Sequence, residues 1–161
     1  MIREVSGDIL LSQAQLIAHG VAPNDAHAAG LALALRDYAP AMYKDFRHFC
    51  KTQHPGPGGL WVWSGANGQR IAALFTQGAA YETGQRPGRA TLNDVRHALR
   101  ALKKFIEQEN VTSVALPRLA TGVGGLEWQD VKPIVHAELG TLPIPVIVYE
   151  TYHAGQRAVE F

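Results

Sequence analysis

Residues 116–134 read LPRLATGVGGLEWQDVKPI, and this stretch carries the clearest signal for the fold. An apolar run leads into a turn with Gly122, Gly124 and Gly125, and the turn leads directly into a helical pattern. Glycine permits positive φ and close approach of a ligand, so successive backbone N–H groups of such a turn can bind an anion. The positive end of the following helix favours the same anion. Taken alone, the stretch fits a phosphate-binding loop and a plain tight turn equally well.

Working outward, strand and helix patterns alternate along most of the chain. Helical periodicity and capping residues predict helices over residues 27–39, 40–53, 91–110 and 127–139. Apolar and β-branched runs predict strands over residues 2–5, 14–22, 60–65, 70–76, 111–117 and 144–151. Asn67 and Gly68 predict a hairpin between the third and fourth strands. This alternation predicts an α/β fold, with helices covering both faces of a sheet.

The bulk composition is that of a globular protein. The 161 residues are 47% hydrophobic and 18% charged, with a net charge of +1, and we expect residues 1–161 to form a single domain. Cys50 is the one cysteine, which is consistent with a reducing compartment. No signal peptide or membrane-spanning run is found, so we expect a cytoplasmic protein that does not enter membranes. The seven histidines lack ligand spacing, so we expect no metal and no other cofactor.

Three polar or glycine-rich segments follow predicted strands, at residues 22–30, 76–89 and 120–125. Ligands of α/β sheets bind beyond the carboxyl ends of the strands, so we expect these segments to meet at one edge. Residues 22–30, APNDAHAAG, enter a helix through small side chains, as the turn after residue 119 does. Two such loops could hold a diphosphate from either side.

At this point the sequence resembles a known family. SGDIL at residues 6–10, residues 19–40 and LPRLATGVGGLEWQDVKPIV at residues 116–135 together resemble a macrodomain, and the resemblance runs over residues 5–149. It is greatest to the branch that contains the terminal ADP-ribose protein glycohydrolase and the antitoxin that removes ADP-ribose from DNA. The resemblance implies a three-layer α/β/α macrodomain with a central mixed sheet, and ADP-ribose as its ligand.

The resemblance also implies where ADP-ribose would bind. Asp8 matches the acid that accepts a hydrogen bond from the adenine amino group, and Ile9 borders the adenine. Tyr152 could stack on the adenine ring. The ligand-binding positions implied in the two loops are Ala22, Asn24, Ala28, Ala29 and Gly30 in the first, and Thr121, Gly122, Val123, Gly124, Gly125 and Leu126 in the second. Trp128 is expected to pack behind the second loop.

One position departs from the branch. Gln77 stands where its glycohydrolases have a nucleophilic lysine, and an amide cannot form a Schiff base with an opened ribose. The lead interpretation is hydrolysis of ADP-ribosyl or O-acyl-ADP-ribose linkages by positioned water, with Asn24, Asp25, His27 and Thr121 as candidate catalytic residues. The alternatives are a non-catalytic ADP-ribose reader and a module for nucleic acid or another nucleotide.

Several single residues have a plainer structural interpretation beside the functional one. His27 could be a solvent-exposed loop histidine, and we expect His19 to be a hydrogen-bonded structural residue of a strand. We expect Cys50 to be a buried small hydrophobe. Arg86 or Arg89 could meet a phosphate or the modified target. The expected partners are ADP-ribose and ADP-ribosylated protein or nucleic acid, and the expected oligomeric state is a monomer.

Overall fold

A computed structural model describes residues 1–79, 81 and 88–161 of the chain. Its helices are η1 (Ile9–Leu11), α1 (Gly30–Tyr38), α2 (Pro40–Gln53), α3 (Leu92–Gln108) and α4 (Trp128–Leu139). Its strands are β1 (Ile2–Gly7), β2 (Leu16–Val21), β3 (Leu60–Ser64), β4 (Arg70–Phe75), β5 (Val114–Pro117) and β6 (Val146–Tyr152). Every helix and strand predicted above is present, and the short helix η1 is an addition.

The strands form one mixed sheet in the order β1-β6-β5-β2-β4-β3. All neighbouring pairs are parallel except β3–β4, which is antiparallel. The turn between β3 and β4 is closed by a hydrogen bond of 3.1 Å from Gly68 N to Gly65 O, and Gly68 has a φ of 84°. The mixed sheet and the hairpin at Asn67 and Gly68 are therefore both confirmed.

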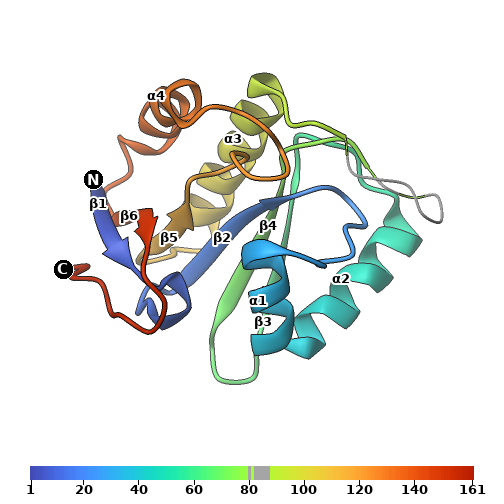
Figure 1. Ribbon diagram of the computed structural model, residues 1–161, viewed down its shortest axis with the longest axis horizontal. Coiled ribbons are helices and arrows are strands. Elements are labelled where there is room, and N and C mark those ends of the chain that lie inside the picture. The colour runs from blue at the N-terminus through green and yellow to red at the C-terminus, as the bar shows by residue number, and fades with distance from the viewer. Residues whose placement is uncertain (80, 82–87) are drawn as a thin grey trace.

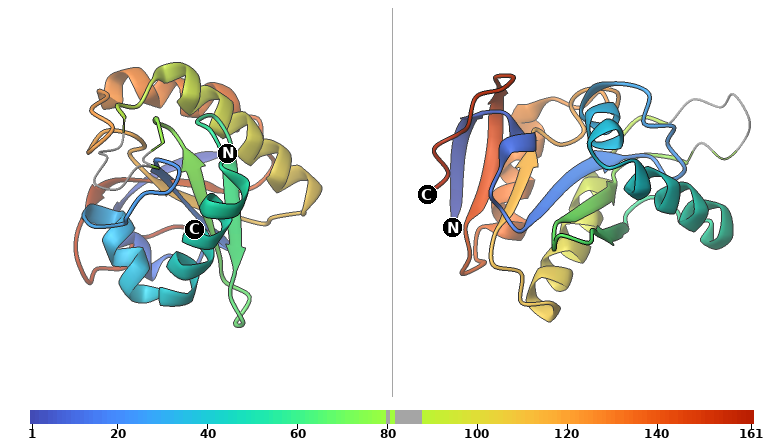
Figure 2. Two further views of the ribbon diagram at one scale, coloured as in Figure 1. Left: turned by 90° about the vertical axis from the view of Figure 1, so that its right-hand side faces the viewer. Right: turned by 90° about the horizontal axis from the view of Figure 1, so that it is seen from below.

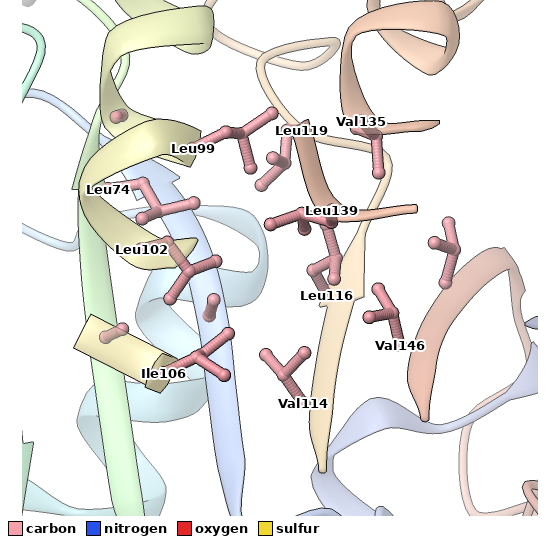
Figure 3. Close-up of a cluster of buried hydrophobic side chains, with 14 of the residues drawn as sticks. Leu74, Leu99, Leu102, Ile106, Val114, Leu116, Leu119, Val135, Leu139 and Val146 are labelled. Carbon is pink, nitrogen blue, oxygen red and sulfur yellow. The ribbon is translucent and has the colours of Figure 1, made fainter. Parts of the chain in front are cut away.

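Two helix pairs cover the two faces of the sheet (Figures 1 and 2). α3 and α4 enclose the larger core, whose members include Leu74, Leu99, Leu116 and Val135 (Figure 3). The other face is covered by α1 and α2, and its core contains Phe46, Cys50 and Phe75, among others. The three-layer α/β/α arrangement predicted from the sequence is confirmed.

Local sequence explains where the helices begin. The Thr91 side chain accepts a hydrogen bond from Asp94 N at 3.1 Å and caps α3. Pro40 occupies the first turn of α2, where its missing N–H costs nothing. Pro133 lies inside α4, as the sequence indicated. Because five strands run parallel, the segments that follow β2, β4 and β5 reach the same edge of the sheet.

Candidate functional site

A cleft of about 960 Å³ opens at the carboxyl ends of β2, β4 and β5. It is lined by the end of β2 and the segment after it, by Gln77 and Tyr81 after β4, and by residues 117–120 and 122–124 after β5. The wall is completed by the first turn of α1 and by three further side chains. Two of these belong to α2, and the third is its C-terminal cap residue. The expected meeting of three loops at one edge is therefore confirmed.

The first loop, residues 22–29, is held in an unusual backbone conformation. Asn24 and His27 have φ of 60° and 52°, and Gly30 has a φ of 59°. Left-handed residues of this kind are uncommon outside glycine, and surrounding contacts must hold them. Asp25 N donates to Ala22 O at 3.1 Å, and His27 N donates to the Asp25 carboxylate at 2.8 Å. The loop is therefore held by hydrogen bonds within its own backbone and to the Asp25 side chain.

His27 is fully buried beneath this loop, so the solvent-exposed interpretation is wrong. Its ring lies 4.7 Å from the Phe46 ring and 5.2 Å from the Tyr43 ring, measured between centroids. His27 Nδ1 lies 3.1 Å from Asp25 O and 3.4 Å from the Asp25 carboxylate. Its place among the aromatic rings of α2 makes His27 an anchor for the loop, and it is not among the residues that line the cleft.

His19 lies next to His27, with ring centroids 5.6 Å apart, and is 2% exposed. We expected a hydrogen-bonded histidine, but among the described residues its Nε2 has no partner. Burial lowers the pKa of His19 from 6.5 to about 3, with a further lowering by His27 that Asp25 partly offsets. His19 is therefore neutral at physiological pH.

Asp25 is the acidic side chain among the described residues that line the cleft. Burial raises its pKa, but hydrogen bonds from the side chain and backbone of His27 outweigh this, and the net pKa lies below the ordinary 3.8. Its side chain is 21% exposed, so the carboxylate is ionised and reaches the cleft wall. Asn24 beside it is buried and also lines the cleft.

The second loop, residues 118–127, is closed by its own backbone. Leu126 N donates to Ala120 O at 2.9 Å, and Gly125 N donates to Gly122 O at 3.1 Å. The Thr121 hydroxyl donates to Arg118 O at 3.0 Å, so it is turned back onto the loop. The loop is a preformed turn, and Thr121 contributes to its closure.

The glycines of the second loop differ in what a side chain at each position would contact. A Cβ at Gly124 would lie 2.7 Å from Ala120 O, and Gly125 has a φ of 77°. Gly122 has nothing within 4 Å of a Cβ position and lines the cleft, as Gly124 and the 70%-exposed Val123 also do. Gly124 is therefore required by the fold, whereas Gly122 leaves open space on the cleft side.

The remaining predicted binding residues are placed as follows. Ala22 and residues 28–30 line the cleft, while Gly125 and Leu126 do not belong to its lining. Asp8, Ile9 and Tyr152 lie at the ends of β1 and β6, beyond the second loop along the sheet.

The Asp8 carboxylate binds two backbone N–H groups. It accepts hydrogen bonds from Leu10 N at 3.0 Å and from Gly155 N at 2.9 Å. Ile9 beside it is 3% exposed, whereas Tyr152 is 63% exposed. Asp8 therefore joins the β1 end to the segment after β6, and the exposed Tyr152 lies on β6 opposite Gly7, the residue before Asp8.

Residues 76–89 contain two arginines that were candidate phosphate contacts, and the structure describes one of them, Arg89. Arg86 lies outside the described residues. A Cβ at Gly125 would lie 2.9 Å from Nη2 of Arg89, so this exposed guanidinium lies against the second loop. Trp128 at the start of α4 packs against the larger core and donates from Nε1 to Glu150 at 3.0 Å, as expected for an anchor behind that loop.

The comparisons with known proteins agree with this geometry. The model of the Macro domain family matches residues 15–135. The chain belongs to the macro domain family.

Macro domains of known activity are among its relatives. The chain is 26% identical to the DNA ADP-ribosyl glycohydrolase of Mycobacterium tuberculosis over 163 residues, which cover 99% of this chain and 45% of that protein. It is 29% identical to the ADP-ribose 1''-phosphate phosphatase of Chaetomium globosum, over 89% of this chain and 88% of that protein. The structure resembles the macrodomain of DarG from Thermus aquaticus with a TM-score of 0.81 and 27% identity, covering 93% and 98% of the two chains. The chain spans less than half the length of the curated glycohydrolases it matches.

Gln77 occupies the position where the resemblance of the sequence implies a lysine. It lines the cleft, is 4% exposed, and pairs with Ala90 in an isolated antiparallel bridge. Its side chain carries a neutral amide, so this position supplies no amine nucleophile. Among the described residues, no group of three or more His, Cys, Asp or Glu side chains could hold a metal ion.

Sequence reasoning missed one wall of the cleft. Arg47 and Lys51 of α2, and His54 at its C-terminal cap, line the cleft together. The available signal was their spacing of four and three residues, which places them on one face of a helix. The spacing alone does not show that this face of α2 meets the cleft, because the other walls come from distant parts of the chain.

Proposed function

We propose that this macro domain binds ADP-ribose in the cleft and hydrolyses the bond that joins ADP-ribose to an acceptor or acyl group. The observation that carries the proposal is the cleft between two preformed loops at the carboxyl ends of β2 and β5. Both loops line the cleft with several alanine and glycine residues, whose small side chains leave room for a ligand to approach the backbone. Backbone N–H groups bind a diphosphate with little reorganisation.

The diphosphate is proposed to lie between the first turn of α1 and residues 122–124. Ala29 precedes α1 and has no side chain that could cap the helix. The first N–H groups of α1 are therefore open to an external acceptor, and Leu31 and Ala32 of that turn line the cleft. The positive φ of Gly30 supports the entry of the chain into this helix.

The adenosine end is proposed to lie toward β1 and β6. Asp8 would accept a hydrogen bond from the adenine amino group, Ile9 would border the ring and Tyr152 would stack on it. The support is the position of all three residues on the side of the second loop that faces away from β4. Adenine at that end leaves the second ribose beside Asn24, Asp25 and Gln77.

For catalysis we propose that Asn24 and Asp25 orient a water molecule against the anomeric carbon of that ribose. Water adds its oxygen to the carbon, the bond to the acceptor breaks, and the acceptor leaves with a proton. The low pKa of Asp25 suits a carboxylate that orients water and stabilises positive charge on the sugar. His27 and Thr121 are proposed to hold the two loops in shape, because neither directs a free group at the cleft.

We propose the molecule to which ADP-ribose is attached by analogy with the relatives. The Mycobacterium tuberculosis protein is a DNA ADP-ribosyl glycohydrolase, so ADP-ribosylated DNA is the first substrate to test. ADP-ribosylated protein is the second, and the Chaetomium globosum relative adds ADP-ribose 1''-phosphate.

A non-catalytic reader is the alternative, and Gln77 favours it. Without a lysine at that position the cleft can hold ADP-ribose and fail to cleave it. The deciding experiment incubates the protein with radiolabelled ADP-ribosylated DNA and ADP-ribosylated protein and measures release. Release that is lost in Asp25→Asn supports hydrolysis by positioned water. Tight ADP-ribose binding without release from either substrate selects the reader.

We further propose a single-domain, monomeric unit that works in the cytoplasm. Cys50 is a free, buried thiol, which suits a reducing compartment. No helix within the described part of the chain is long and apolar enough to cross a membrane.

A further inference from the structure

The C-terminal half of α2 presents a row of basic side chains to the cleft. Arg47 and Lys51 are one helical turn apart, and His54 follows at the C-terminal cap of α2. His54 stacks on Tyr81, with ring centroids 4.3 Å apart and planes 14° apart. This row is the side of the cleft that the proposed contacts to ADP-ribose leave unused.

Within the described part of the chain, neither cation of the row is neutralised. The ion pairs formed between described residues include neither Arg47 nor Lys51. Asp45, the acid of α2, accepts a hydrogen bond from Trp63 Nε1 at 3.0 Å, so it is occupied elsewhere. Arg47 donates from Nη1 to the Tyr43 hydroxyl at 2.9 Å, while its Nε has no acceptor among the described residues. Both side chains therefore retain donors and charge for an external anion.

The sheet order places this row at one end of the expected ligand. From β1 to β4 the order is β1-β6-β5-β2-β4, which is four inter-strand spacings or about 19 Å. The adenine is proposed near β1 and β6, the diphosphate between β5 and β2, and the second ribose beside Gln77 after β4. α2 lies across the molecule from β1 and β6 (Figure 1), so its basic row lies beyond the second ribose.

We infer that Arg47 and Lys51 form a subsite for a further phosphate group, one that lies beyond the second ribose of bound ADP-ribose. The inference rests on the proposed function, because the direction of the ligand in the cleft comes from it. The backbone N–H groups of the two loops already serve the diphosphate, so two further cations at the sugar end need another anion. Arginine binds phosphate through its planar fork and lysine through its point charge. The phosphate can belong to the strand of an ADP-ribosylated nucleic acid or to a phosphate ester on the second ribose itself.

The test compares three ligands and three variants. The ligands are ADP-ribose, ADP-ribose 1''-phosphate and a single-stranded oligodeoxynucleotide that carries one ADP-ribose, titrated at times too short for release. The variants are Arg47→Gln, Lys51→Gln and, as the matched control, Lys44→Gln. Lys44 is exposed on the same helix and is not among the residues that line the cleft.

We expect one of the two phosphate-bearing ligands to bind about ten-fold more tightly than ADP-ribose. Lys51→Gln and Arg47→Gln should each remove about five-fold of that gain and leave the Kd of ADP-ribose unchanged. If a nucleic-acid strand supplies the phosphate, each variant also lowers the salt dependence of oligonucleotide binding by about 0.7 in log–log slope. If a phosphate ester on the second ribose supplies the phosphate, ADP-ribose 1''-phosphate is the ligand that binds more tightly than ADP-ribose, and the two variants reduce that difference in affinity.

Two results would overturn the inference. One is wild-type protein that binds ADP-ribose as tightly as both phosphate-bearing ligands, which leaves the proposed function intact. The other is a loss in Arg47→Gln and Lys51→Gln no larger than in Lys44→Gln. Wild-type protein that binds none of the three ligands would instead defeat the proposed function, and this inference with it.

Discussion

At the scale of single residues, Asp8 has two hydrogen-bond partners within the protein. Its carboxylate caps η1 through Leu10 N and holds Gly155 N of the segment after β6. The proposed adenine contact would be a third hydrogen bond to a group that is already fixed in place. Such preorganisation limits the cost of ordering the side chain on binding.

Asp8→Asn tests this role, because asparagine keeps one oxygen that can cap η1 through Leu10 N. Its NH2 group cannot accept from Gly155 N, so thermal unfolding of the variant must accompany the binding measurement. We expect the variant to weaken ADP-ribose binding by about ten-fold, since a charge-assisted hydrogen bond is lost. Ribose 5-phosphate, which lacks adenine, should bind equally to both proteins. Calorimetric titration of the two ligands measures this, and an unchanged Kd for ADP-ribose would refute the assignment of Asp8.

We expect buried His19 to make the free energy of unfolding depend on pH in the acidic range. Its pKa is about 3 in the folded protein and 6.5 in the unfolded chain, so between these values only the unfolded chain binds the proton. Stability should therefore fall as the pH drops from 6.5 toward 3, with a slope approaching about 1.4 kcal/mol per pH unit. Urea unfolding at a series of pH values measures that slope.

His19→Gln should flatten the slope because glutamine does not titrate. His48→Gln, which removes an exposed histidine of α2, should leave it as in the wild-type protein. His27 and Asp25 face His19, and the low pKa of Asp25 places its own contribution below pH 3.8. An unchanged slope in His19→Gln between pH 6 and pH 4 would show that another group is responsible.

Predictions about single residues were confirmed where the local sequence pattern determines whether the side chain is buried. Cys50 is buried because it lies on the apolar side of an amphipathic helix, as expected. His27 could not be predicted, because its burial depends on Tyr43 and Phe46, which belong to the next helix. The role of a loop side chain is set by what packs against it, and a single sequence does not contain that information.

At the scale of elements, the second loop allows its glycines to be tested separately. Gly124→Ala would place a methyl group 2.7 Å from Ala120 O and 2.9 Å from the Ala90 Cβ. We expect it to lower stability by about 1–3 kcal/mol and to weaken ADP-ribose binding by distorting the loop.

Gly122→Ala is the matched variant, because a Cβ there meets nothing within 4 Å. We expect its stability to equal that of the wild-type protein, while ADP-ribose binding falls because the methyl group enters the cleft. Thermal unfolding and titration of both variants separate the two effects. Full affinity in Gly122→Ala would mean that the ligand does not approach this loop.

Helices and strands were predictable because their signals are local. The Thr91 cap, the proline at the start of α2 and the β3–β4 hairpin all appear in the sequence and in the structure. Strand ends were less accurate. Residues 111–117 were expected to be one strand, but β5 begins at Val114. The reason is that Val111 N donates to Ile106 O and Thr112 N donates to the Gln15 side chain, so neither N–H pairs with the backbone of a neighbouring strand.

At the scale of the whole molecule, the sheet order explains why separate segments make one site. Alternating strands and helices predicted layers, but they did not predict that β2 would lie between β5 and β4. That order brings both loops together and places α2 at one end of the cleft (Figure 2). The basic row of α2 was missed for this reason, since its neighbours come from distant parts of the chain.

The most direct measurement of the account is an isothermal titration of the wild-type protein with ADP-ribose, with AMP and ribose 5-phosphate as fragments. We expect one ADP-ribose per chain, bound more tightly than either fragment, because the cleft would hold the diphosphate and the second ribose while the adenine reaches Asp8 beyond the cleft lining. No binding of ADP-ribose, or binding no tighter than AMP, would contradict it.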